Sequence, residues 1–357
     1  NFKGSNFTVN VNKLNKINSS LHEDVFYPAE LMFSPSSKLL QLSTIVDKEI
    51  LFPKEYPYTS STTKVLRENF EELYKECRKI ISISSKDLII DVGSNDGNLL
   101  NNFKKHHKVL GITPEKIGKI AIKKGINTLI KYFNKDTANL VLKKFGRAKI
   151  VTATNVFAHI DDLNSLMKNL LQVLINDGVF ISESHYLVSL IETNQYDTIY
   201  HEHLRYYSLT SLKYLFNKYD MEIIHAKKIN THGGSIRVYA ARKKRFEIRK
   251  SVTKILNFEK EFLNWKTFIN FKKNVVQSKL NLYSILKKLK NENKELMAEL
   301  RDATPSRVCT AHPAQQQAPS TIGACIACCD QEASHVVLPC GHLCLCGSCT
   351  EQLSACP

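Results

Sequence analysis

Nine of the ten cysteines of this 357-residue chain lie between Cys309 and Cys356, and this clustering most constrains what the chain can fold into. The composition changes in the same region, because Lys, Asn and Ile dominate up to about Met297 and Ala, Pro, Gln and Ser follow. The charge divides there too: residues 1–297 carry +19 and the remainder −3, for a net +16. The pattern predicts two unrelated units, each with its own function.

The bulk properties fit a globular protein of two or three domains. No apolar run approaches the ~20 residues that span a bilayer, so we expect no membrane partner. The lysines of the first unit are scattered over every segment rather than gathered on one face among aromatic residues, so we expect no nucleic-acid partner. The cysteine spacing fits metal-bound thiols, which predicts a reducing, cytoplasmic compartment.

Strands and helices alternate after an expected helix over residues 63–80. Near-continuous apolar strands between amphipathic helices predict an α/β fold with a parallel sheet covered on both faces. The expected strands span residues 88–92, 109–113, 128–130, 149–153 and 178–183, with helices over 115–124 and 162–174. A last strand is expected after residue 234. Residues 249–300 show a long helical pattern of one or two helices, which could pack on the core or mediate dimerisation. We expect packing on the core, because the apolar residues outnumber a strict two-per-heptad seam.

A glycine-rich loop follows the first of these strands. It reads Asp91-x-Gly93-x-Asn95-x-Gly97 and opens a helix. Glycine allows a tight turn and lets the backbone approach a ligand, and ligands of open α/β sheets bind at the carboxyl ends of strands. The spacing differs from Gly-x-Gly-x-x-Gly, which favours S-adenosylmethionine over a dinucleotide. A plain Asn/Gly turn is the alternative.

Three further motifs follow in order: Asn155-Val-Phe-Ala-His159, Tyr200-His-Glu-His203 and Thr231-His-Gly-Gly-Ser235. Together with the glycine loop, they resemble the S-adenosylmethionine-dependent sugar C-methyltransferases over residues 26–296. The resemblance implies a Rossmann-like class I methyltransferase sheet. It also implies methyl transfer to a ring carbon beside the ketone of a nucleotide-linked 4-keto-deoxysugar, so a nucleotide sugar is the expected substrate.

The resemblance also implies roles for individual residues. Carbon becomes nucleophilic when a proton beside the carbonyl is removed, and a histidine can remove it. By resemblance, His203 is the base, Glu202 and His201 orient it or the sugar, and Tyr200 and His159 are candidate donors to the developing enolate. Tyr58 completes the implied catalytic set, the cofactor set is Asp91, Gly93, Asn95, Gly97, Glu115 and Asn155, and the sugar set is Tyr56, His232, Gly233 and Ser235. For any single histidine, a hydrogen-bonded structural role is the alternative.

The chain departs from the family pattern at three points. Ser34 and Ser37 stand where the family has a zinc-binding cysteine pair and the other pair is absent, so we expect no N-terminal zinc. Thr113 stands where the family places a ribose-binding Glu, and Glu115 is the expected substitute. The family continues into a second α/β domain, whereas this chain leaves the pattern near Leu296.

The cysteines follow a linker over residues 301–322 that has no apolar period. Paired cysteines two residues apart, with a Cys-x-His between the pairs, suit tetrahedral zinc. Residues 325–357 resemble RING fingers of the inhibitor-of-apoptosis type, which implies a ubiquitin-conjugating enzyme as partner. By resemblance, one zinc site is complete with Cys325, Cys328, Cys346 and Cys349, and a second is incomplete with Cys340, His342 and Cys356. A zinc knuckle without ligase activity is the alternative.

The expected organisation has five parts: an N-terminal lobe over 1–62, the methyltransferase domain over 63–245, a helical segment over 246–300, the linker, and a truncated RING over 323–357. The leading hypothesis is a sugar C-methyltransferase that carries a zinc-binding tail. The competing one is a RING-type ubiquitin ligase or adaptor whose degenerate methyltransferase fold is a scaffold. A gene fusion and a faulty gene model would give the same sequence.

Overall fold

The computed structural model describes residues 27–52, 59–303, 335–337 and 342–345, with side chains up to Glu295 except that of Glu49. The chain divides into two compact units, Asn1–Lys287 and Lys288–Pro357. Tyr56, Tyr58 and all the expected zinc-binding cysteines lie outside the described residues. Within the part that is described, no helix is long and apolar enough to cross a membrane.

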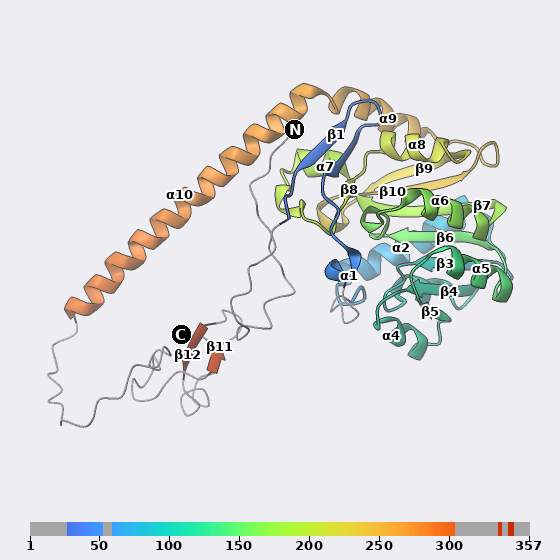
Figure 1. The fold of residues 1–357 in the computed structure, drawn as a ribbon, viewed down its shortest axis with the longest axis horizontal. Coiled ribbons are helices and arrows are strands. Elements are labelled where there is room, and N and C mark those ends of the chain that lie inside the picture. Colours follow the sequence, from blue (N-terminus) through green and yellow to red (C-terminus); the bar gives the residue numbers. More distant parts are fainter. Residues whose placement is uncertain (1–26, 53–58, 304–334, 338–341, 346–357) are drawn as a thin grey trace. The chain divides into compact units, whose positions relative to one another are not determined.

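The first unit is built on a seven-stranded sheet with the order β5-β4-β3-β6-β7-β10-β9 (Figure 1). Its strands are β3 (Leu88–Val92), β4 (Lys108–Thr113), β5 (Thr128–Ile130), β6 (Ala148–Thr154), β7 (Leu174–His185), β9 (Met221–Ile229) and β10 (Ser235–Arg242). Strands β3 to β7 are parallel, and β10 runs antiparallel to both of its neighbours. From β3 the chain proceeds outward to β4 and β5 and then returns to β6 on the other side of β3. The strand order therefore reverses between β3 and β6, which places a ligand crevice at the carboxyl ends of these strands.

The central strands contain continuous apolar runs because both faces of the sheet are covered. In β3, Leu88, Ile90 and Val92 join one hydrophobic cluster and Ile89 joins the other. The cluster of Ile89 is covered by α2 (Lys64–Ile80), α3 (Asn98–Phe103) and α4 (Gly118–Lys123). The other is covered by α5 (Lys135–Lys144), α6 (Leu163–Val173), α7 (Leu187–Glu192) and α8 (Leu209–Asn217). The expected parallel sheet with helices on both faces is confirmed, whereas α5 and β9 were not anticipated from the sequence.

A small second sheet joins the N-terminal segment to the core. It consists of β1 (Leu31–Ser34), β2 (Leu39–Leu42) and β8 (Arg205–Tyr206), and the short α1 (Lys48–Leu51) follows it. Because β8 begins two residues after His203, this sheet fixes the histidine segment against the N-terminal hairpin. In the hairpin turn, the backbone N–H of Ser37 donates to Oγ of Ser34 at 3.4 Å.

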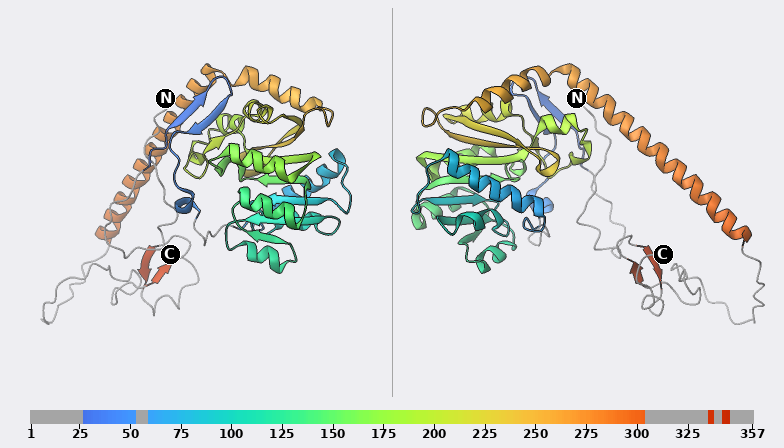
Figure 2. Two further views of the ribbon diagram at one scale, coloured as in Figure 1. Left: turned by 45° about the vertical axis from the view of Figure 1, so that its right-hand side comes forward. Right: turned by 180° about the vertical axis from the view of Figure 1, so that it is seen from behind.

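The long helical pattern forms two helices, α9 (Lys250–Phe262) and α10 (Trp265–Ala303). Helix α9 packs on the core through Glu259, which is buried and accepts hydrogen bonds from the backbone N–H groups of Leu209 and Thr210 at the start of α8. Phe268 and Phe271 of α10 are also buried in the core. Every side chain from Lys279 to Glu295 is exposed, so the expected packing on the core is wrong for this stretch. Figure 2 shows α10 as one uninterrupted helix.

The second unit contains two short strands, β11 (His335–Val337) and β12 (His342–Leu345). They pair antiparallel, with Val337 opposite His342. His342, an expected zinc ligand, therefore begins β12.

Candidate active site

A cavity of about 1540 Å³ opens at the carboxyl ends of the parallel strands. Ten of the residues singled out by motif line it: Asp91, Gly93, Asn95, Glu115, Asn155, His159, Tyr200, Glu202, His203 and His232. Motifs that are far apart in the sequence therefore meet in one space. A single small ligand fills roughly 300–1,000 Å³, so this cavity has room for two substrates side by side.

The glycine loop is shaped by backbone that requires glycine. Gly93 has φ +77°, and a Cβ placed on it would lie 2.1 Å from Cγ2 of Val156. Asn95 adopts φ 49°, and Gly97, at φ 77°, is the N-cap of α3. Gly93 and Asn95 line the cavity, whereas Gly97 is buried and holds the turn.

The residues before α2 hold this loop from outside. The backbone N–H of Ser60 donates to Oδ1 of Asn95 at 3.0 Å, and the Ser60 hydroxyl donates to Oδ1 of Asp96 at 2.7 Å. Lys124 pairs with the other Asp96 oxygen at 2.9 Å. Asp96 is fully buried and was not anticipated as part of the site, although its place inside the loop motif was a usable signal.

Two carboxyl groups lie at the ends of neighbouring strands that border the cavity. Asp91 is buried, and burial, with nearby Glu183, raises its pKa to about 7 against a hydrogen bond from Thr152. Glu115 lies just after β4, and the Thr113 hydroxyl donates to its Oε2. The two residues that replace the family's usual Glu are thus joined: Thr113 orients a carboxylate that lines the cavity.

Four histidines surround the opposite end. The His203 ring centroid lies 5.1 Å from that of His159 and 6.3 Å from that of His185, and His232 lines the same cavity. Burial lowers the pKa of His203 to about 3, and proximity to His159 adds to this. Burial also lowers the pKa values of His159, His185 and His232. The cluster is therefore neutral at physiological pH.

Hydrogen bonds assign the tautomer of His203. Its Nδ1 lies 3.1 Å from the Thr198 carbonyl oxygen, which can only accept, so a neutral ring carries its proton on Nδ1. Nε2 is then an acceptor and lies 3.3 Å from the Tyr200 hydroxyl. Nε2 is therefore the unprotonated ring nitrogen, as a general base needs, and in this structure it accepts from the phenol of Tyr200, which lines the cavity.

His159 and His201 have different surroundings. The Nδ1 of His159 lies 2.5 Å from the Glu202 carbonyl oxygen, so in a neutral ring its Nε2 is an acceptor rather than a donor. Nε2 of His201 contacts the Pro28 carbonyl at 3.3 Å, and its ring packs near Tyr27, outside the cavity lining. Of the two candidate donors to the enolate, Tyr200 and His159, Tyr200 is therefore the better placed.

The Thr231–Ser235 turn brings His232 into the cavity. His232 has φ 51°, and Gly233 and Gly234 follow at 75° and 119°. A Cβ on Gly233 would lie 2.4 Å from Oε1 of Gln195. Ser235 is fully buried and donates to the Thr231 carbonyl, so it closes the turn and does not line the cavity.

Two residues that sequence reasoning missed connect this turn to the cavity. Gln195 donates to the Gly233 carbonyl at 2.6 Å and accepts, through Oε1, from Nε2 of His185 at 2.8 Å. His185 ends β7 and lines the cavity. Its position at the carboxyl end of an expected strand was the available signal.

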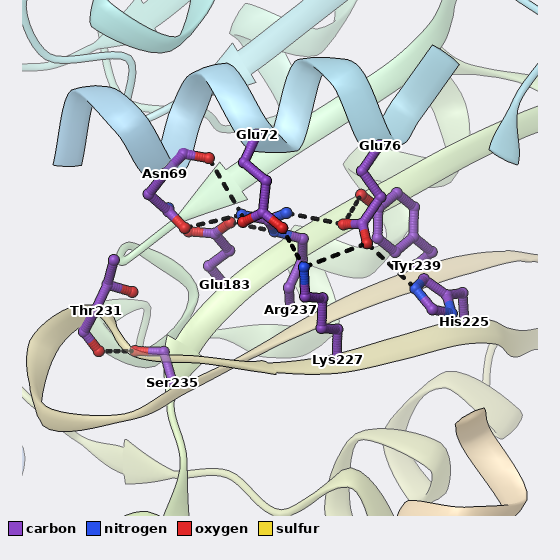
Figure 3. A network of polar contacts seen from close by, with 10 residues as sticks. All are labelled: Asn69, Glu72, Glu76, Glu183, His225, Lys227, Thr231, Ser235, Arg237 and Tyr239. Atoms are coloured by element: carbon purple, nitrogen blue, oxygen red, sulfur yellow. Dashed lines mark hydrogen bonds and ion pairs between the residues drawn. The ribbon is translucent and has the colours of Figure 1, made fainter. Parts of the chain in front are cut away.

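A buried polar network connects α2 with β7, β9 and β10 next to the site (Figure 3). Arg237 of β10 is fully buried and donates to Glu183 at 2.5 Å, to Glu76 at 2.8 Å and to the side chain of Asn69 at 2.8 Å. Burial alone raises the pKa of Glu76, but hydrogen bonds from His225, Arg237 and Tyr239 lower it to about 2. The Glu183 carbonyl also accepts from the N–H of Asn155, so the network fixes a cavity residue.

Among the described residues, no group of three His, Cys, Asp or Glu side chains is placed to hold a metal ion.

Comparisons with known proteins match the chain in three segments. Residues 64–226 match a methyltransferase domain, residues 230–299 a C-methyltransferase C-terminal domain, and residues 321–357 a C3HC4-type RING finger. The C-methyltransferase NovU of Streptomyces niveus is 30% identical over 220 residues, which cover 61% of this chain and 52% of NovU. The chain thus spans about half the length of this curated relative.

Solved structures also resemble the first unit. Magnesium protoporphyrin IX methyltransferase from Synechocystis PCC 6803, with bound S-adenosylhomocysteine, is 12% identical and covers 50% of this chain and 83% of its own, with a TM-score of 0.40. A methyltransferase from Thermotoga maritima is 16% identical and covers 50% and 90%, with a TM-score of 0.38. The fold assignment rests on the strand order and the family matches rather than on these superpositions.

The sheet order and the matched domains define a Rossmann-like S-adenosylmethionine-dependent methyltransferase fold. More particularly, residues 230–299 are similar to the C-terminal domain of C-methyltransferases, and residues 321–357 are similar to a RING-type zinc finger.

Proposed function

We propose that the first unit transfers a methyl group from S-adenosylmethionine to a ring carbon beside the ketone of a nucleotide-linked 4-keto-deoxysugar. The observation that carries the proposal is the position of His203, whose acceptor Nε2 lies beside Tyr200 in the same cavity as the glycine loop. A base, a hydroxyl donor and a cofactor loop in one space are what carbon methylation requires.

The cofactor end fits S-adenosylmethionine. The loop at Gly93 leaves no room for a side chain, and the buried Ser94 hydroxyl has no hydrogen-bond partner among the described residues. Glu115 would accept hydrogen bonds from ribose hydroxyls, as an acidic residue after the second strand does in related cofactor sites. A cationic ligand near Asp91 would draw its raised pKa back toward that of a charged carboxylate. When bound, the cofactor supplies an electrophilic methyl group.

The opposite end fits proton removal from the sugar. Nε2 of His203 would take the proton from the carbon beside the ketone, and Tyr200 would donate a hydrogen bond to the enolate oxygen that develops. The carbon would then attack the methyl group, which leaves a C-methyl sugar, S-adenosylhomocysteine and a protonated His203. The negative charge of the enolate and of the nucleotide diphosphate would raise the pKa of His203 in the complex and favour the transfer.

Replacing Glu115 by Gln tests the cofactor end. Hydrogen bonds to a charged partner contribute about 1.5–3 kcal/mol, so the dissociation constant for S-adenosylmethionine should rise roughly 10–100-fold, as measured by calorimetric titration of the full chain. Glu247→Gln removes an exposed carboxylate outside the cavity lining and should leave binding unchanged. No binding to the folded wild-type chain would refute the proposed cofactor.

A second candidate function belongs to the C-terminal segment, because residues 321–357 match a RING finger. We propose that this segment binds zinc through Cys325, Cys328, Cys346 and Cys349 and recruits a ubiquitin-conjugating enzyme. Cys340, His342 and Cys356 would supply ligands of a second site.

Cys325→Ala should remove the zinc of the complete site and abolish autoubiquitination, because a RING of this size depends on its metal for folding. Zinc content by atomic emission and a ubiquitination assay over a panel of conjugating enzymes measure the two effects. Cys309→Ala, outside the ligand pattern, is the matched control. A zinc-loaded wild-type chain that is inactive with every conjugating enzyme would leave only the zinc knuckle.

A further inference from the structure

Helix α10 carries a dense set of exposed apolar side chains. Each of the following is more than half exposed: Val276, Leu280, Leu282, Tyr283, Ile285, Leu286 and Leu289. Single exposed apolar residues are ordinary, whereas a contiguous set on one helix marks an interaction surface. A solvated helix also gains little stability without a packed face.

The exposed residues follow a heptad. Phe268, Val275, Leu282, Leu289 and Leu296 recur every seven residues, and each is apolar. In the frame that places these five at position d, position a holds Trp265, Lys272 and Lys279 in the first part of the helix, followed by Leu286, Asn293 and Leu300. Phe268 is buried in the core and Val275 packs against it, but Leu282 and Leu289 are exposed. The stripe therefore leaves the core between Val275 and Leu282 and continues as an exposed seam of Leu282, Leu286, Leu289 and Asn293. In the sequence, the same heptad pattern continues to Leu296 and Leu300.

We infer that this seam forms a parallel two-stranded coiled coil with the same helix of a second copy of the chain. Leucine at d, together with a single asparagine at a, specifies a two-stranded register, because paired Asn side chains hydrogen-bond across the seam. The seam extends from Leu282 to Ala303, about 33 Å at 1.5 Å per residue. This length covers three heptads.

The flanking charges agree with parallel pairing. In that arrangement, position g of one helix meets the following position e of the other. Ile285 then meets the methylenes of Lys290, and Glu292 meets the uncharged residue 297, so no like charges oppose each other. Positions on the outer side of the helix are polar: Ser284, Lys287, Lys288, Asn291 and Lys294. Residues 304–321, which follow α10, have no apolar period that would supply a partner helix from the same copy.

Sedimentation equilibrium of the full chain tests this inference. The wild type should sediment at about twice its mass of 40.7 kDa. Leu289→Asp places a charge inside the seam and should weaken association roughly 100-fold or more. Asn293→Leu removes the group that limits the coil to two strands and should shift the mass above that of a dimer.

Leu280→Asp is the matched control. Leu280 is 53% exposed and Leu289 is 54% exposed, but Leu280 falls at position b, outside the seam. This variant should remain dimeric. All three variants should keep the wild-type circular dichroism of the α/β core, because the substituted side chains are exposed. A monomeric wild type at tens of micromolar, equal dissociation by Leu280→Asp and Leu289→Asp, or a dimer that survives Leu289→Asp would each overturn the inference.

Discussion

Replacing Arg237 by Met should lower the free energy of unfolding by about 3–5 kcal/mol at pH 7, because breaking a buried ion pair leaves its partner charge uncompensated. The Arg237 side chain is 0% exposed, and its guanidinium contacts Glu183 at 2.5 Å and Glu76 at 2.8 Å. The same network ties α2 to β7 and β10 (Figure 3). Urea unfolding followed by circular dichroism measures the change.

The pH dependence of this defect has a definite sign. Burial raises the pKa of Glu183, and Arg237 opposes that rise. Without the arginine, the pKa of Glu183 rises further above its unfolded value, so its contribution favours folding at low pH and is lost as the pH increases. The pKa of Glu76 is lowered to about 2, so its contribution is present above its unfolded pKa and depends partly on Arg237. Glu183 therefore makes the defect smaller at pH 5 than at pH 8, whereas the contribution of Glu76 changes only below its unfolded pKa of 4.5.

Two companion variants separate the ion pair from general effects of the substitution. Arg245→Met removes an exposed arginine from the same chain and should change the stability by no more than about 0.5 kcal/mol. Glu183→Gln in the Arg237→Met background should recover part of the loss, because the amide needs no counter-charge. An Arg237→Met protein as stable as Arg245→Met would show that the network makes no net contribution to folding.

The elements of the fold that could be predicted are those determined by the local sequence. Strands β3, β4 and β6 are buried on both faces, so their apolar residues form continuous runs that can be recognised from the local sequence alone. Strand β9 was missed because it lies at the edge of the sheet and alternates apolar residues with His225, Lys227 and Lys228. The antiparallel insertion of β10 between β7 and β9 depends on pairing between distant strands, which no local pattern encodes.

The residues of the site also divide into those that the sequence predicted and those that depend on tertiary contacts. Gly93 was expected from its loop at a strand end, and Glu115 and His203 were expected from a family resemblance; all three line the same cavity. Arg237 and Glu183 were missed because their pairing follows from the register of β10 on β7, where they lie directly opposite each other. The role of Gln195 likewise depends on the positive-φ turn at Gly233, which is a tertiary contact.

Replacing His203 by Gln should reduce methyl transfer by about 10²–10⁴-fold, the usual contribution of a general base, and leave S-adenosylmethionine binding intact. The assay follows S-adenosylhomocysteine formation with a panel of nucleoside-diphosphate 4-keto-6-deoxysugars. A second readout is deuterium exchange from solvent into the carbon beside the ketone, which needs the base but no methyl donor. His106→Gln replaces an exposed histidine outside the cavity and should behave as wild type.

The pH profile separates a base from a structural histidine. A base must be unprotonated, so activity is lost as the pH falls through its pKa. Burial and the neighbouring His159 lower the pKa of His203 to about 3, which keeps the base form present at mildly acidic pH. Because kcat/KM reports the free enzyme, it should show no acid limb from His203 between pH 8 and pH 5, where an ordinary histidine would lose activity near 6.5. Wild-type deuterium exchange in the His203→Gln protein would assign the proton transfer to another residue, and Tyr200→Phe would then be the next variant to examine, because its hydroxyl lies 3.3 Å from the same nitrogen.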